Sequence, residues 1–148
     1  MALPCIESMR LEKGYRVWSS DITPEDNPYE AGLGFAVRLR KPVDFIGKEA
    51  LVRAREQGIT RKLCPILLDE ARWIALGGEP VRVNHRPLGR VTSGGYGYTI
   101  DRSIAYAYLP VEHAVAGTAV EVEVFGRWIP GSVAAEPLYD PTGARIKA

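Results

Sequence analysis

The chain has 148 residues, of which 46% are hydrophobic, and its 19 Lys and Arg residues nearly balance 18 Asp and Glu residues, for a net charge of +1. This length and apolar content allow one core, or one small domain with part of another, and they exclude a disordered tail. Because the basic clusters are short, we expect no nucleic-acid partner. No apolar run approaches the roughly 18 residues of a membrane-spanning helix, so we expect no membrane partner.

The positions of the cysteines and histidines limit which metal sites and disulfides the chain can form. Cys5 and Cys64 lie far apart, and neither His85 nor His113 has ligand spacing to a cysteine. We therefore exclude a structural zinc site and expect no metal. One disulfide could form, but nothing resembles the cysteine framework of a secreted protein, so we expect reduced thiols and a cytoplasmic protein.

The first predicted element is a short helix that ends at Gly14. Pro4 suits its first turn, and Glu12 lies at its end, beside the following turn. On composition alone, Glu12 is a solvated residue that pairs loosely with Lys13 or Arg16. The apolar side of the helix consists of Leu3, Ile6, Met9 and Leu11.

The next elements are short and separated by turn residues. Tyr15–Trp18 and Leu33–Arg40 are predicted as strands because each is an apolar run bounded by Gly, Pro or Asn. Apolar residues from Ile46 to Ala54 then recur at helical spacing, and Gly58 stands where a helix commonly ends. We expect this helix to link a first unit, residues 1–58, to a second unit, residues 59–148.

The second unit has the pattern of a small all-β domain, in which short Val-, Ile- and Tyr-rich runs alternate with turns. Residues 120–124 alternate strictly between Val and Glu, which predicts one buried and one wet face. The glycines at 94, 95 and 97 lack the lysine and serine of a phosphate-binding loop, so we expect them to allow a tight bend or a close backbone approach. The predicted strands are Lys62–Leu68, Val81–Val83, Arg86–Ser93, Ile104–Leu109, Ala119–Val124 and Arg127–Ala134.

Three stretches resemble the glycine-cleavage T-protein (aminomethyltransferase) family. They are Met9–Val37, which contains R-L-E at residues 10–12, FIGKEAL at Phe45–Leu51, and LGRVTSGGYGYTIDRSIAYAYLP at Leu88–Pro110. The chain is most similar to the folate-binding C-terminal regions of dimethylglycine and sarcosine dehydrogenases and oxidases. The resemblance implies an α+β fold: the C-terminal part of a folate-binding domain, followed by a six-stranded antiparallel β-barrel.

The resemblance also implies a role for Glu12. In this family, the Glu of R-L-E holds the pterin ring of tetrahydrofolate. An ionised carboxylate suits this role, because the pterin 2-amino group and the adjacent ring N–H are parallel donors that it can accept together. Tyr15, Trp18 and Tyr29 could flank the ring, and each is equally explained as a core residue.

The same resemblance suggests cations for the glutamyl tail of folate. A family arginine that contacts folate corresponds to Lys41, which Arg40 precedes. Lysine lacks the guanidinium fork, so we expect a weaker contact, or one passed to Arg40 or Arg38. A second family arginine aligns with Arg127, for which a surface cation is an equal alternative.

The family's catalytic aspartate precedes the matched region, so we expect no catalytic residue in this chain, and no flavin fingerprint is present. We expect an inactive C-terminal portion of a longer enzyme, of aminomethyltransferase or dimethylglycine or sarcosine oxidase-dehydrogenase type. In it, tetrahydrofolate would receive a one-carbon unit from a methylated glycine or similar amine, with any FAD bound elsewhere in the parent. The alternative is a non-catalytic barrel module for domain packing or subunit contact. The expected partners are folate, a small amine-derived substrate, an upstream domain or partner subunit, and a second copy of the chain.

Overall fold

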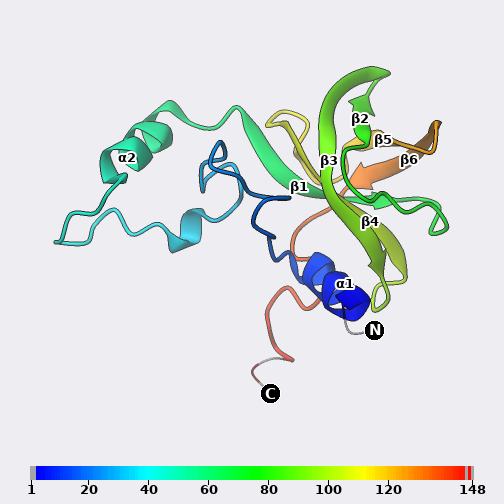
Figure 1. The fold of residues 1–148 in the computed structure, drawn as a ribbon, viewed down its shortest axis with the longest axis horizontal. Helices are drawn as coiled ribbons and strands as arrows, with labels where there is room; N and C mark the ends of the chain where they lie inside the picture. Colours follow the sequence, from blue (N-terminus) through cyan, green and yellow to red (C-terminus); the bar gives the residue numbers. More distant parts are fainter. Residues whose placement is uncertain (1–2, 146, 148) are drawn as a thin grey trace.

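The computed structural model describes residues 3–145 and 147 (Figure 1). The described chain starts with a helix that lies against a β-barrel, then runs through an arm that contains a second helix, and ends in a segment that returns to the first helix. The elements are α1 (Leu3–Lys13), the short 3-10 helix η1 (Gly34–Ala36), α2 (Lys48–Gln57), β1 (Arg61–Leu68), β2 (Pro80–Val83), β3 (Arg86–Gly97), β4 (Arg102–Pro110), β5 (Ala119–Val124) and β6 (Arg127–Val133).

The six strands form a closed barrel in the order β1-β4-β3-β2-β5-β6, and every neighbouring pair is antiparallel. Two hairpins of the barrel, β2–β3 and β5–β6, are connected by tight two-residue turns. Asn84 and His85 join β2 to β3, and Phe125 and Gly126 join β5 to β6, each pair with positive φ at both positions. Such turns match the twist of the strands that they connect. The predicted α+β class with a six-stranded barrel is confirmed.

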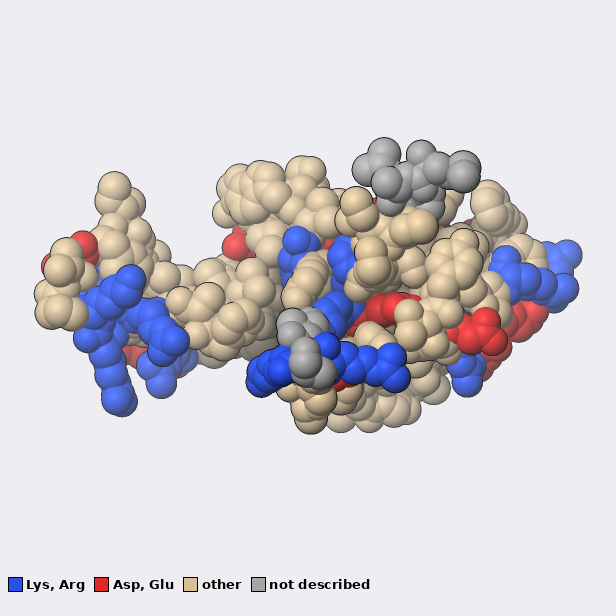
Figure 2. Space-filling view, turned by 90° about the horizontal axis from the view of Figure 1, so that it is seen from below, with Lys and Arg blue, Asp and Glu red and all other residues tan. Residues whose placement is uncertain are grey.

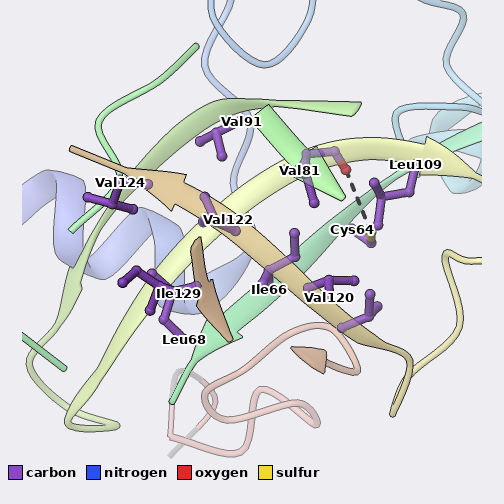
Figure 3. Packing of buried hydrophobic residues seen from close by; sticks show 14 of the residues in the cluster. Cys64, Ile66, Leu68, Val81, Val91, Leu109, Val120, Val122, Val124 and Ile129 are labelled. Carbon is purple, nitrogen blue, oxygen red and sulfur yellow. Dashed lines mark hydrogen bonds between the residues drawn. The ribbon is translucent and has the colours of Figure 1, made fainter. Parts of the chain in front are cut away.

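The barrel interior is filled by alternate side chains from all six strands (Figure 3). In β5, the three valines predicted to be buried are buried, and the glutamates between them lie on the outer face. Burial raises the pKa of the Cys64 thiol to about 12, so the thiol is protonated and packs as a small apolar group. The labelled interior residues are Cys64, Ile66, Leu68, Val81, Val91, Leu109, Val120, Val122, Val124 and Ile129.

The helix α1 lies against β3, and its Leu11 side chain packs on apolar residues of β1 and β4. Leu11 is fully buried against Leu63, Ile104 and Tyr106. The glycines of β3 allow this contact: a Cβ on Gly95 would lie 2.9 Å from Leu11 Cδ1. The expectation that these glycines permit a close approach is therefore confirmed.

The prediction of two strands before α2 is wrong. Tyr15–Trp18 forms only an isolated bridge between Trp18 and Ile22, and Leu33–Arg40 contains η1 and turns. Their backbone groups bond locally, as in Asp21 N–H to the Val17 carbonyl at 2.9 Å and Leu33 N–H to the Pro28 carbonyl at 2.7 Å. Each run has the composition of a strand, but among the described residues neither pairs with a neighbouring strand.

The arm, residues 34–58, extends away from the barrel (Figure 1). Neither η1 nor α2 contains a buried residue, and Ile46, just before α2, is fully exposed. The helix α2 ends at Gly58 as predicted. Within the described residues, no helix has the length and apolar character needed to cross a membrane.

Candidate functional site

Glu12 lies in the last turn of α1, and it is buried, with 2% of its surface exposed. Its Oε1 atom accepts the backbone N–H of Thr99 at 2.6 Å and that of Ile100 at 3.2 Å, both in the turn between β3 and β4. The alternative of a solvated helix-end glutamate is therefore wrong. Its expected partners pair elsewhere: Lys13 with Asp140 and Arg16 with Glu136.

A pocket of about 410 Å³ opens beside Glu12. Its volume is within the roughly 300–1,000 Å³ that is typical of small-molecule sites. Residues of α1 form one wall, the β3–β4 turn and the C-terminal segment form others, and Tyr15 lies at the edge, more than half exposed. The lining residues are Ile6, Met9, Arg10, Glu12, Lys13, Tyr15, Thr99, Tyr139, Asp140 and Arg145.

The C-terminal segment that forms one wall of this pocket is held to α1 by an ion pair between Lys13 and Asp140. Lys13 Nζ donates to the Asp140 carbonyl at 2.6 Å and to Asp140 Oδ2 at 3.2 Å. Partial burial is the largest single influence and acts to raise the pKa of Asp140, but the Lys13 ammonium and the backbone N–H groups of Arg145 and Ala144 together outweigh it, so the pKa of this carboxyl is lowered. Arg145 lies over the Tyr139 ring at 5.4 Å. Tyr139 N–H bonds to the Glu12 carbonyl at 3.0 Å, which holds the tyrosine beside the carboxylate.

A buried ion pair fixes α1 to the barrel behind the pocket. Arg10 Nη1 donates to Asp21 Oδ2 at 2.8 Å, and Asp21 is almost fully buried. The other Asp21 oxygen accepts the hydroxyls of Thr92 at 2.7 Å and Ser93 at 2.6 Å, and Val17 N–H bonds to Oδ2 at 3.0 Å. This carboxylate therefore has four donors, which is the arrangement that a buried charge requires.

A second polar cluster joins the C-terminal segment to the other side of α1. Arg16 forms a forked ion pair with Glu136, and its Nη1 also contacts the Gly14 carbonyl. The Tyr106 hydroxyl lies 3.0 Å from Glu136 Oε1 and 3.1 Å from the Leu11 carbonyl. Burial raises the pKa of Tyr106, so its hydroxyl stays protonated and donates.

A separate basic pocket of about 790 Å³ lies on the arm. Tyr29, Arg40 and Lys41, predicted as site residues, all line it, together with Arg38 and Arg55. Figure 2 shows Lys and Arg side chains gathered at the end of the molecule that the arm occupies. The Tyr29 hydroxyl is buried without a hydrogen-bond partner among the described residues. This pocket and the Glu12 pocket share no lining residue.

The predicted site residues are thus divided among three places. Glu12 and Tyr15 line the first pocket, and Tyr29, Arg40 and Lys41 line the basic pocket. Arg127 begins β6 on the barrel, where its guanidinium lies 5.7 Å from the Trp73 ring, and it lines neither pocket. Trp18, the other aromatic considered, is largely exposed and lines neither pocket.

Sequence reasoning missed four residues of the Glu12 pocket: Thr99, Tyr139, Asp140 and Arg145. Thr99 acts through its backbone N–H, which any non-proline residue would supply, so no side-chain pattern marks it. Asp140 lies 127 residues beyond Lys13, and no local spacing connects them. Arg55 belongs to a short basic stretch of the sequence, and its place in the basic pocket depends on the turn of the arm.

Comparison with family models gives two matches. A model described as the glycine cleavage T-protein C-terminal barrel domain matches residues 61–140, and a model of the GCVT N-terminal domain matches residues 1–41. The first match covers the barrel and the start of the C-terminal segment. The second covers α1 with Glu12 and the loop up to Lys41.

Several curated proteins are similar to the chain. Rat (Rattus norvegicus) mitochondrial dimethylglycine dehydrogenase is 39% identical over 144 residues, which are 96% of this chain and 17% of that protein. An aminomethyltransferase of Symbiobacterium thermophilum is 43% identical over 141 residues, which are 93% of this chain and 37% of that protein. A 4-methylaminobutanoate oxidase (formaldehyde-forming) of Paenarthrobacter nicotinovorans is 37% identical over 142 residues.

Among solved structures, the glycine cleavage system aminomethyltransferase T of Bartonella henselae superposes with a TM-score of 0.84 at 33% identity, covering 91% of this chain and 38% of that one. The chain thus spans between about a sixth and two fifths of the length of these relatives.

Proposed function

This chain belongs to the glycine cleavage T-protein family, and we propose that it supplies the C-terminal part of a tetrahydrofolate-dependent one-carbon transfer protein. We propose further that the parent protein couples this transfer to oxidative demethylation of a methylated glycine or a similar amine. The names of the relatives, which include an aminomethyltransferase and a dimethylglycine dehydrogenase, support this linkage. A flavin that carries out the oxidation would belong to another part of the parent.

The observation that carries the proposal is the Glu12 carboxylate in the wall of a pocket of small-molecule size. The pterin head of folate presents N–H donors and a flat ring. A carboxylate oxygen is a strong acceptor for such donors, and the pocket also contains the aromatic side chains of Tyr15 and Tyr139. Its apolar side chains, Ile6 and Met9, suit the faces of a ring. The residues present therefore fit the pterin.

The basic pocket on the arm supports binding of the anionic tail. Arg38, Arg40, Lys41 and Arg55 line it, and no acidic residue does. The tail of folate carries carboxylates, to which a guanidinium group donates two parallel hydrogen bonds and which a lysine contacts as a point charge. Arg40 and Arg38 can therefore supply the forked contact that Lys41 cannot.

Bound tetrahydrofolate supplies the nitrogen that accepts the one-carbon unit. This chain's contribution is binding and orientation: Glu12 fixes the pterin, and the basic pocket holds the tail. Orientation of this kind lowers a barrier because the entropy of alignment is lost on binding rather than in the reaction. We assign no catalytic residue to this chain.

The second candidate function is a non-catalytic packing module. One observation favours it: Glu12 Oε1 bonds to the barrel turn, so the carboxylate has a structural use even without a ligand. The two functions differ in their requirement for a ligand, because only the first needs the pocket to be filled.

Titration of the ¹⁵N-labelled chain with 5-formyltetrahydrofolate, a folate that resists oxidation, separates them. We expect saturable shifts in the amide signals of Thr99, Ile100 and Tyr139, which surround the carboxylate. A control titration with p-aminobenzoylglutamate, which has the tail but no pterin, should leave these three signals unmoved. If no signal near Glu12 responds to either compound up to millimolar concentration, the packing module is the better description.

A further inference from the structure

One wall of the Glu12 pocket is a compact loop, residues 139–145, which lies beside α1 (Figure 1). We call it the C-terminal loop. Internal hydrogen bonds hold it together: Asp140 Oδ1 accepts the Ala144 N–H at 2.9 Å, and Arg145 Nη1 donates to the Tyr139 hydroxyl at 2.5 Å. The loop therefore keeps part of its shape through contacts of its own.

The C-terminal loop is attached to the rest of the chain at few points. Among the described residues, its hydrogen bonds and ion pairs to other segments all end on two adjacent residues of α1. Tyr139 N–H bonds to the Glu12 carbonyl at 3.0 Å, and Lys13 Nζ contacts the Asp140 carbonyl at 2.6 Å and its Oδ2 at 3.2 Å. Every residue of the loop is exposed or half-buried. Segments with these properties open locally while the rest of the protein stays folded.

The other walls of the pocket are fixed more firmly. The α1 wall is anchored by Leu11, which is fully buried, and by the ion pair of Arg10 with the buried Asp21. The turn between β3 and β4 ends a hairpin of two long strands and donates two N–H groups to Glu12. Just before the loop, Leu138 packs against the Leu11 cluster. The C-terminal loop is therefore the wall that moves at the lowest cost.

The burial of Glu12 calls for such a movement. Glu12 lines the pocket, but only 2% of its surface is exposed. A ligand ring cannot make an extensive contact with so little surface. Access to this side chain therefore requires one wall of the pocket to move, and the C-terminal loop begins at the residue that bonds to the Glu12 backbone.

We propose that the C-terminal loop is a gate of the Glu12 pocket: it moves away from α1 to admit the ligand, and the Lys13–Asp140 ion pair holds it closed. This inference rests on the proposed function and adds a conformational step to it. Opening breaks the bonds to Glu12 and Lys13 and keeps those inside the loop, so the loop moves as one body. The ion pair stabilises the closed state of both the free and the ligand-bound chain. Weakening it should therefore speed entry and exit alike and leave the equilibrium affinity nearly unchanged.

Amide hydrogen exchange of the ligand-free wild-type chain tests the opening itself. The Tyr139 N–H should exchange by local opening, at a rate that low urea concentrations barely change. The N–H groups at the centre of β5, which pairs with strands on both sides, should exchange only on global unfolding and therefore speed up with urea. If Tyr139 shows the urea dependence of β5, the loop opens only when the barrel unfolds, and the proposal is overturned.

Asp140→Asn tests the ion pair. Asparagine keeps the oxygen that accepts the Ala144 N–H and tolerates the positive φ of this position, so the shape of the loop is retained. It removes the charge that faces Lys13, and we expect exchange of the Tyr139 amide to become about threefold to tenfold faster. Asp44→Asn, which breaks an exposed Asp–Lys ion pair on the arm, is the matched control and should leave this rate unchanged. Equal exchange rates in the two variants would show that the ion pair does not hold the loop closed.

Stopped-flow kinetics with 5-formyltetrahydrofolate test the passage of the ligand. In Asp140→Asn, the association and dissociation rate constants should rise by a similar factor, about threefold to tenfold, and in Asp44→Asn neither should change. Unchanged rates, or faster dissociation alone, would mean that the loop is a fixed wall or a ligand contact. The gate would then be overturned while the proposed function stands. Absence of folate binding to the wild-type chain would overturn the proposed function, and the gate with it.

Discussion

At the scale of single residues, the proposed ligand contact of Glu12 shares its carboxylate with a structural contact that sequence reasoning did not predict. The motif around it indicated a ligand contact, and its position at a helix end indicated an ordinary glutamate. The structure gives one oxygen a structural partner, the β3–β4 turn, and places the side chain in a pocket wall. A buried carboxyl group without hydrogen-bond partners would be costly, and the two backbone donors offset that cost beside a partly apolar pocket.

Glu12→Gln separates these uses, because glutamine keeps one oxygen and replaces the other with an NH₂ donor. The oxygen can still accept from Thr99 and Ile100, so we expect the free energy of unfolding to fall by only about 1 kcal/mol. The NH₂ group would face pterin donors, and folate affinity should fall by about 2 to 3 kcal/mol, roughly fiftyfold or more. Isothermal titration and urea unfolding of the same preparations measure both quantities.

The matched control for this change is Glu112→Gln, since Glu112 is exposed on the loop after β4. It should alter neither quantity by more than about 0.5 kcal/mol. Unchanged folate affinity in Glu12→Gln would remove Glu12 from the binding site.

At the scale of elements, α1 and the barrel act as one packed unit even though they match different family models. Leu11 fills the apolar gap over β1 and β4, and Asp21 collects donors from α1, from the loop after it and from β3. The helix has 11 residues, fewer than an isolated helix needs to be stable in water. Its stability therefore comes from these contacts, and so does the orientation of Glu12.

Asp21→Asn should test this dependence. The amide NH₂ cannot accept a hydrogen bond, so it would face either the Arg10 and Val17 donors or the Thr92 and Ser93 hydroxyls, and Arg10 would lose its buried counter-ion. We expect the free energy of unfolding at pH 7 to fall by about 3 to 5 kcal/mol, as for other broken buried ion pairs.

Asp44→Asn is the matched control, because Asp44 forms an exposed ion pair with Lys48 on the arm. It should cost no more than about 0.5 kcal/mol. Comparable urea midpoints for the two variants would mean that the Asp21 cluster contributes little to the attachment of α1.

At the scale of the whole molecule, the sequence predicted what depends on local pattern and missed what depends on distant contacts. The Val and Glu alternation of β5 and the glycine after α2 predicted those elements correctly. Tyr15–Trp18 and Leu33–Arg40 have the composition of strands, but a strand also needs a partner edge, which no local pattern reveals. The residues that line the Glu12 pocket could not be predicted for the same reason. Lys13 and Asp140, for example, come into contact only in the folded chain.

The unit boundary near Gly58 is still a prediction, and expression of residues 60–148 tests it. The barrel interior is drawn entirely from residues within this stretch, so we expect a cooperative urea transition. The fragment lacks Leu11, which leaves the surface around Leu63, Ile104 and Tyr106 uncovered. We therefore expect it to be less stable than the full chain by about 2 to 5 kcal/mol. A fragment without a cooperative transition would show that α1 belongs to the folding unit of the barrel.

The final prediction concerns the affinity of the full chain for tetrahydrofolate, which we expect to be weaker than about 1 μM. The Glu12 pocket and the basic pocket share no lining residue, and the arm that forms the second has no buried residue in either of its helices to fix its position. A ligand that reaches both pockets must therefore order the arm, and this ordering opposes binding.

Isothermal titration measures the affinity directly, and a chain with Arg40 and Lys41 both changed to alanine shows whether the basic pocket takes part. If one ligand occupies both pockets, this double variant should bind tetrahydrofolate severalfold more weakly than the wild type does. Its unfolding midpoint should be unchanged, because both side chains lie on the arm, away from the barrel core. A sub-micromolar affinity of the wild-type chain would show that the arm is already ordered for the ligand, and the argument from the two separate pockets would fail.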